Sequence, residues 1–187
     1  MDAAVLQSLA HWPHVPRCTG WLALDQRGQW WMRHQAGPAI WPRDAHGRLV
    51  KTDAGPVLHA GLTAFIGRNY TVDATGAWYF QNGPQRVDVS LEVAPWIIRL
   101  QSQASQAWST HTGQTCKVES IWLDGMGRIW LRTHLGPGLL HSADMPLLAD
   151  RLDAQGTQLR LPGSAPMNLG HFTAPPATFF GFRLDPP

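Results

Sequence analysis

Apolar and polar residues alternate along several short stretches of the chain, and a tight turn interrupts each stretch. In LALDQRGQWWMR, which begins at Leu22, apolar and aromatic side chains recur on both sides of Asp25 and Gly28. This alternation is typical of half-buried β-strands, and the central D-x-x-G predicts the turn of a β-hairpin. The Gly-Pro pair at Gly37 ends the second strand, because proline cannot donate a ladder hydrogen bond.

The same pattern occurs a second time, 99 residues further along the chain and without a gap. The segment IWLDGMGRIWLRTHLGP, from Ile121, matches LALDQRGQWWMRHQAGP at 7 of 17 positions, where chance gives about one match at ordinary residue frequencies. The identical pairs are Leu24/Leu123, Asp25/Asp124, Gly28/Gly127, Trp31/Trp130, Arg33/Arg132, Gly37/Gly136 and Pro38/Pro137. We therefore predict that the two halves of the chain are related copies of one structural unit.

The D-x-x-G signature occurs five times in all. Its copies begin at Asp25, Asp44, Asp73, Asp124 and Asp153. The aspartate side chain can accept a hydrogen bond from a backbone N–H two residues on, and glycine tolerates the left-handed conformation that the turn demands. Each copy predicts a hairpin, and several hairpins must share a sheet because a lone one is barely stable.

The predicted fold class is mainly β (α+β with minor helix), arranged as two pseudo-repeated antiparallel β-hairpin subdomains. The N-terminal subdomain is predicted to span residues 1–105 and the C-terminal subdomain residues 106–187, with a polar connection near 100–115. Each subdomain alone buries limited area, so we expect the two to pack through an apolar seam.

Composition favours few helices. Lys and Glu, both good helix formers, occur only twice each among the 187 residues. Short helices are predicted at Ala3–Leu9, capped by Asp2, and at Ala143–Leu152, capped by Asp144.

Charge and hydropathy exclude several classes of partner. The formal net charge is +2, which is too small to indicate nucleic acid or an acidic surface. The N-terminus has neither the basic start nor the apolar run of a signal peptide, and no stretch approaches the ~18 apolar residues of a membrane helix. We expect a cytoplasmic protein with reduced thiols that binds neither nucleic acid nor membrane.

Ten tryptophans are the most unusual feature of the composition. Their favoured role is to form the core of thin sheets, and the alternative is a stacking platform for a sugar or a base. Trp30 and Trp31 are adjacent and must point to opposite faces of a strand. Because Trp31 has the repeat partner Trp130, Trp30 is predicted to lie on the less buried face and to contact ligand.

Two cysteines and nearby histidines raise the question of a metal site. His14 and Cys18 precede the first repeat, and His111 and Cys116 precede the second, a set that could form a tetrahedral zinc site. The spacing matches no compact metal motif, so ordinary part-buried cysteines are favoured, with a disulfide as the third alternative. No metal and no cofactor are predicted.

One block carries more polar functional groups than a hairpin requires. Amide and guanidinium groups at strand ends can form a directional site for a carboxylate, a phosphate or a peptide backbone. The predicted ligand-binding residues are Arg68, Asn69, Tyr70, Gln81, Asn82, Gln85 and Arg86, together with Trp30. The competing interpretation is turn chemistry at Asn82-Gly83 and ion pairs between the arginines and neighbouring aspartates.

The motifs of this block extend over much of the chain. RNY, WYFQNGPQRV, APW, THTG and the closing FGF..DP together resemble an uncharacterised bacterial domain-of-unknown-function family with internal β repeats. The resemblance implies a cytoplasmic bacterial protein with a repeated architecture, and it implies no catalytic residue. The stretch from Ile40 to Leu49 is longer than the resemblance leads us to expect.

Catalytic motifs are missing from the sequence: it has no G-x-S-x-G elbow, no phosphate-binding glycine loop and no calcium loop. The leading hypothesis is therefore a non-enzymatic binding or regulatory module, for instance in signalling, with a protein or a small molecule as ligand. The alternatives are a small hydrolase using His and Asp, and a structural protein that forms oligomers. A homodimer is one of the assemblies that the sequence leaves open.

Overall fold

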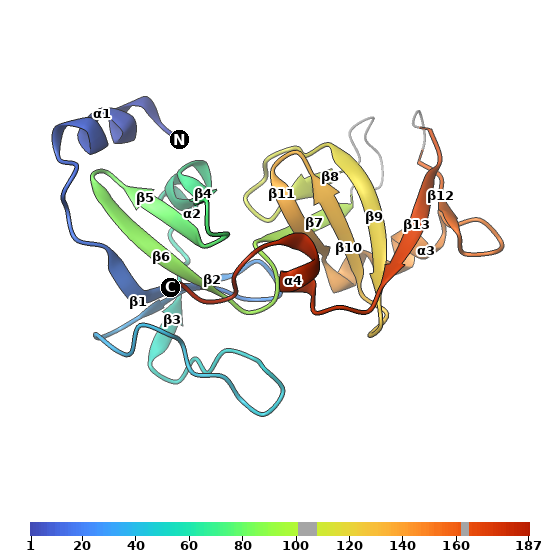
Figure 1. Cartoon of the computed structure of the whole chain (residues 1–187), viewed down its shortest axis with the longest axis horizontal. Helices are drawn as coiled ribbons and strands as arrows, with labels where there is room; N and C mark the ends of the chain where they lie inside the picture. Colours follow the sequence, from blue (N-terminus) through green and yellow to red (C-terminus); the bar gives the residue numbers. More distant parts are fainter. Residues whose placement is uncertain (101–107, 162–164) are drawn as a thin grey trace. The chain divides into compact units, whose positions relative to one another are not determined.

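The protein is described by a computed structural model of residues 1–100, 108–161 and 165–187 (Figure 1). The mainly β fold with minor helix is confirmed. The chain forms two compact units, of which unit 1 contains residues 1–93 and 181–187 and unit 2 contains residues 94–180. The predicted boundary between residues 105 and 106 lies outside the described residues and stays a prediction.

Unit 1 is built on a six-stranded sheet with the order β3-β2-β1-β6-β5-β4. All neighbouring strands are antiparallel except β1 and β6, which run parallel. The strands are β1 (Cys18–Leu24), β2 (Trp30–Arg33), β3 (Ala54–Pro56), β4 (Tyr70–Val72), β5 (Trp78–Asn82) and β6 (Gln85–Leu91).

Unit 2 is built on a seven-stranded sheet with the order β12-β13-β9-β10-β11-β7-β8. Its parallel pairs are β13 with β9 and β11 with β7. The strands are β7 (Trp96–Leu100), β8 (Trp108–Thr110), β9 (Val118–Asp124), β10 (Ile129–Thr133), β11 (Gly136–Leu140), β12 (Gln158–Leu159) and β13 (Met167–Phe172).

The two sheets share a common topology. The order β3-β2-β1-β6-β5 of unit 1 corresponds strand by strand to β11-β10-β9-β13-β12 of unit 2. Within these five strands each unit has one parallel pair, and the two pairs, β1–β6 and β9–β13, occupy the same position. A helix follows the matching strands β3 and β11 along the chain: α2 (Ala60–Arg68) in unit 1 and α3 (Met145–Ala149) in unit 2. The predicted repeat therefore extends from the hairpin to the whole sheet, and only β4, β7 and β8 fall outside it.

The helices differ in part from the prediction. Helix α1 (Ala3–His11) occurs where one was expected, but the Asp2 side chain makes no capping hydrogen bond. The second predicted helix is reduced to a 3₁₀ turn, Ser142–Asp144, followed by α3. Helix α4 (Pro176–Phe180) was not predicted. Within the described ranges, no helix combines the length and the apolar character that crossing a membrane requires.

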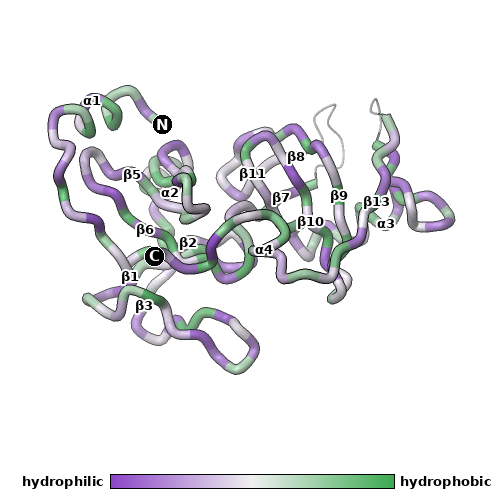
Figure 2. The backbone as a smooth tube through the Cα atoms, in the orientation of Figure 1, coloured by the Kyte–Doolittle hydropathy of each residue, from purple (hydrophilic) through white to green (hydrophobic). Residues whose placement is uncertain are grey.

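Aromatic side chains form much of each core. In unit 1, Tyr70 packs between Trp30 and Trp78, with ring centroids 5.1 Å and 4.8 Å away. In unit 2, Trp130 stacks on Phe180 at 5.5 Å. Figure 2 shows hydrophobic and hydrophilic segments alternating along the strands of both units. Burial of these large rings supplies apolar area that long Leu-rich helices would otherwise provide.

Candidate functional site

All five D-x-x-G segments form the predicted turn. In each, the glycine N–H donates to the aspartate carbonyl, as Gly28 does to Asp25 at 3.0 Å. The five glycines have φ between 67° and 82°, the left-handed region that other residues adopt only with strain. A further turn of the same backbone form at Thr110–Gly113 was not predicted, because threonine replaces the aspartate.

Two of the turns are tied to tryptophans of the core. Oδ1 of Asp25 accepts hydrogen bonds from two backbone N–H groups of its turn, and Oδ2 accepts one from the indole of Trp31 at 2.9 Å. In Asp124, Oδ1 likewise accepts from two backbone N–H groups of its turn, and Oδ2 accepts from the indole of Trp130 at 2.9 Å. The matching surroundings confirm that the two segments are structural copies.

The predicted ligand-binding block falls into three groups of contacts, although the backbone N–H of Gln81 donates to the carbonyl of Asn69 at 2.9 Å. Arg68 and Asn69, at the end of α2, hold the carboxylate of Asp2 at 3.2–3.3 Å. Tyr70 is 7% exposed and Trp30 1%, so both lie in the core. The expectation that Trp30 lies on the less buried face is wrong, because Trp31 is the half-buried member of the pair.

The third group lies on the β5–β6 hairpin, where Gln81 pairs with Arg86 and Asn82 with Gln85. Gln81 is buried, and its amide donates to the carbonyl of Gly83 at 3.0 Å. Arg86 binds Asp73 at 2.6 Å and Asp88 at 2.7 Å, and its guanidinium covers the ring of Tyr79. These bonds fit the competing interpretation of ion pairs and turn chemistry, while a ligand at these residues stays a prediction.

The four candidate metal ligands belong to different units: His14 and Cys18 to unit 1, His111 and Cys116 to unit 2. Both cysteines are free thiols, which argues against the disulfide alternative. In the described part of the chain, no group of three or more His, Cys, Asp or Glu side chains could hold a metal ion. Burial raises the pKa of the Cys116 thiol to about 11.

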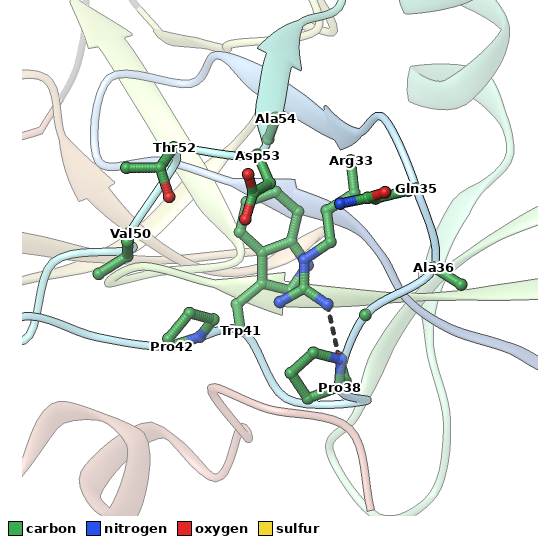
Figure 3. Close-up of a pocket in the computed structure, with 11 residues that line it drawn as sticks. Arg33, Gln35, Ala36, Pro38, Trp41, Pro42, Val50, Thr52, Asp53 and Ala54 are labelled. Atoms are coloured by element: carbon green, nitrogen blue, oxygen red, sulfur yellow. Dashed lines mark hydrogen bonds between the residues drawn. The ribbon is translucent and has the colours of Figure 1, made fainter.

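A pocket of about 200 Å³ opens in unit 1 beside the end of β2. Eleven residues line it, all between Arg33 and Ala54 (Figure 3). Arg33 lies with its guanidinium 4.7 Å from the ring centroid of Trp41, and its Nη1 donates to the carbonyl oxygen of Pro38 at 2.6 Å. Arg33 is only 8% exposed, so this pocket has a buried positive charge in its wall.

Glycine at position 37 makes the placement of Arg33 feasible. A Cβ on Gly37 would lie 2.5 Å from Nη1 of Arg33, closer than any real contact. Beneath the guanidinium, Trp41 packs with Ala23 and Leu49 in a buried cluster. The indole Nε1 of Trp41 is buried and has no hydrogen-bond partner.

The pocket lies where unit 1 departs from its repeat. Twenty residues separate the paired positions Arg33 and Ala54, whereas four separate the equivalent positions Arg132 and Pro137 in unit 2. The connection formed by residues 34–53, which we call the inserted segment, therefore has no counterpart of similar length. Sequence reasoning missed this site, although the unusual length of the stretch from Ile40 to Leu49 was a signal that could have indicated it.

Charged groups fasten the inserted segment to the sheet. Lys51 Nζ lies 3.0 Å from Asp25 Oδ2 and 3.3 Å from Glu92 Oε2, and the backbone N–H of Leu49 donates to the same Glu92 oxygen. Burial alone would raise the pKa of Asp25, but the hydrogen bonds from Trp31, its turn and Lys51 lower that pKa below the usual value. The segment is thus held by the same aspartate that organises the first repeat turn.

Known proteins share the sequence pattern of almost the whole chain. A model of the DUF2944 family, described as "Protein of unknown function (DUF2946)", matches residues 1–177. The chain belongs to this family. A comparison of this DUF2944 member with curated proteins finds no match.

Two solved structures resemble this DUF2944 chain. A DUF1285 family protein from Silicibacter pomeroyi DSS-3 has a TM-score of 0.52 at 12% identity, covering 91% of this chain and 96% of its own. A DUF1285 family protein from Shewanella baltica OS155 has a TM-score of 0.44 at 13% identity, covering 72% of this chain and 94% of its own. The first likeness supports the fold alone, and neither description names an activity.

Proposed function

We propose that the protein is a non-enzymatic binding module whose ligand site is the pocket under the inserted segment. The supporting observation is that Arg33, a buried cation, forms the wall of an open pocket in the part of unit 1 that departs from its repeat. Joining these two strands does not require a pocket, because the equivalent connection in unit 2 joins its strands with only four residues.

The size of the pocket favours a small molecule over a protein segment. At about 200 Å³ it lies below the roughly 300–1,000 Å³ of pockets that take drug-sized ligands. Its wall combines an aromatic ring, a guanidinium and the carboxylate of Asp53, which are groups that orient a ligand rather than react with it. A regulatory role and a cytoplasmic location remain predictions from the sequence.

The test is a metabolite screen followed by two-dimensional amide NMR of the full chain. We expect at least one compound to shift the amide signals of residues 35–37 and 50–54, while the signals of the equivalent unit 2 connection, residues 133–136, stay in place. A screen whose binding compounds shift only signals outside the inserted segment would overturn this assignment, and so would a screen without any binder.

A further inference from the structure

We infer that the pocket takes a small monocarboxylate whose carboxylate is held by the guanidinium of Arg33. This inference rests on the proposed function and adds the chemical class of the ligand to it. Three features of the pocket support it: the charge of Arg33, the hydrogen-bond donors that the chain leaves unused, and the carboxylate of Asp53.

Arg33 is a buried arginine whose charge no nearby carboxylate of the described residues balances. Six arginines in the described ranges form ion pairs with aspartates, namely Arg17, Arg43, Arg68, Arg86, Arg99 and Arg128. Among the described residues Arg33 is the arginine with the lowest exposure, yet no carboxylate lies within 4.0 Å of it. A buried charge without a counter-charge is costly, so an anion that enters the pocket is stabilised there.

Hydrogen-bond donors in the pocket wall exceed the acceptors that the chain supplies. A guanidinium has five N–H donors, and the bond to the Pro38 carbonyl uses one nitrogen, Nη1. The other N–H groups of Arg33 have no acceptor within the described residues. A carboxylate matches this surplus, because its two oxygens accept from a guanidinium fork in a bidentate geometry.

Asp53 sets the charge that the ligand can carry. Asp53 is exposed and lines the same pocket, and no Lys, Arg or His nitrogen of the described residues lies within 4.0 Å of its carboxylate. A phosphate dianion would face this carboxylate with only one arginine to balance two charges, whereas a monocarboxylate is neutralised by Arg33 alone. An amino or hydroxyl group on the ligand could then donate to Asp53 or to Thr52, which makes a small amino acid or hydroxy acid the best fit.

The size of the cavity sets an upper limit on the ligand. Since one water molecule occupies about 30 Å³ of liquid volume, a cavity of about 200 Å³ accommodates a molecule with only a few carbon atoms. Larger acids and peptides would have to leave most of their surface outside.

The experiment titrates the full chain with four probes while the pocket amide signals are followed by NMR. The probes are glycine, acetate, ethanolamine and inorganic phosphate. We expect glycine and acetate to shift the signals of residues 35–37 and 50–54, with glycine binding more tightly. Ethanolamine, which lacks the carboxylate, should leave them in place, and phosphate should bind more weakly than acetate.

Substitutions at Arg33 provide the decisive comparison. Arg33→Lys keeps the charge and most of the apolar stem but loses the fork, and we expect glycine affinity to fall about tenfold or more. Arg33→Met should abolish binding. The matched control is Arg132→Met at the equivalent repeat position, where the guanidinium lies over Phe180 outside the pocket; its glycine affinity should equal that of the wild type.

A second variant shows whether the Arg33 variants lose binding because the pocket changes or because the protein misfolds. Gly37→Ala places a methyl group on the far end of the Arg33 side chain, which can move at small cost to the fold. We expect it to weaken glycine binding while the melting temperature stays near that of Gly125→Ala, a glycine with no atom near its Cβ position.

The possible outcomes separate the two proposals. Unchanged glycine affinity in Arg33→Lys and Gly37→Ala would overturn the carboxylate inference, as would tighter binding of phosphate or ethanolamine than of acetate. If neutral metabolites shift the pocket signals and carboxylates do not, the binding function stands and the ligand class is wrong. If no compound reaches the pocket, both proposals fail.

Discussion

Asp25 and Asp124 lie 99 residues apart and accept equivalent hydrogen bonds from two turn amides and one tryptophan indole. They differ in the cation that approaches the second carboxylate oxygen. Asp124 binds Arg128 of its own turn at 2.7 Å, whereas Asp25 binds Lys51 of the inserted segment at 3.0 Å. The turn aspartate of unit 2 therefore forms its ion pair within its own turn, whereas that of unit 1 binds the segment that forms the pocket.

The turn aspartates should contribute unequally to stability. Asp124→Ala removes the acceptor of two turn amides and of the buried Trp130 indole, and we expect it to lower the free energy of unfolding by about 2–4 kcal/mol. Asp44→Ala removes only two exposed backbone bonds and should cost about 1 kcal/mol or less. Chemical denaturation of both variants measures the difference, and equal losses would contradict the structural role of the indole bond.

Acid should destabilise the fold through the same carboxylates. Burial by itself would raise the pKa values of Asp25, Asp124 and Asp144, but hydrogen bonds lower all three. The largest lowering comes from the Trp31 indole for Asp25 and from the Arg128 backbone N–H for Asp124. For Asp144 it comes from the Arg99 side chain. A lowered folded-state pKa stabilises the protein above the unfolded value of about 3.9, and this contribution is lost as the pH falls through the folded value.

We therefore expect the free energy of unfolding to be level between about pH 5 and 7 and to decline below about pH 4. Denaturant titrations across this range measure the decline. Asp124→Asn, which cannot titrate, should show a shallower decline than the wild type. An identical pH dependence in this variant would show that Asp124 does not contribute to the effect.

The two thiols should differ in reactivity. Burial raises the pKa of Cys116 to about 11, and Cys18, which is half-buried, has its pKa raised by burial and by the nearby Asp88. Because the thiolate is the reactive form, a thiol reagent at pH 8 should label Cys18 first and Cys116 only on unfolding. Mass spectrometry of digests after timed labelling locates each adduct, and fast labelling of Cys116 in the folded protein would contradict this burial.

Equivalent glycines in the two sheets should tolerate substitution differently. Gly55 pairs with Met32, and Gly138 with Leu131 at the matching repeat position. A Cβ on Gly138 would lie 2.6 Å from the Ile98 side chain, which is fully buried, whereas a Cβ on Gly55 would meet only the exposed ring of His34 at 3.0 Å.

Gly138→Ala is accordingly expected to cost about 1–3 kcal/mol through overpacking, while Gly55→Ala should stay within about 0.5 kcal/mol of the wild type. Thermal and denaturant unfolding of the pair compare the two sites directly. A larger loss for Gly55→Ala would mean that His34 is held more rigidly than its exposure indicates.

The sequence by itself determined the repeat and its turns. A D-x-x-G turn depends on atoms within five residues, so its hydrogen bonds and its left-handed glycine can be predicted from the local letters alone. The same holds for the alternation that made the strands recognisable. The mainly β fold and the equivalence of Asp25 and Asp124 therefore follow from the pattern of residues along the chain.

Only the tertiary structure decided which strands meet and where a pocket opens. The parallel pairs β1–β6 and β9–β13 join strands that no turn connects, and local sequence carries no signal for such long-range contacts. Likewise, Arg33 and Arg132 are the same residue type at matching repeat positions, yet Arg33 is buried over Trp41 and Arg132 lies exposed over Phe180. The length of the chain that returns to the sheet creates this difference, because twenty residues can fold over an arginine and four cannot.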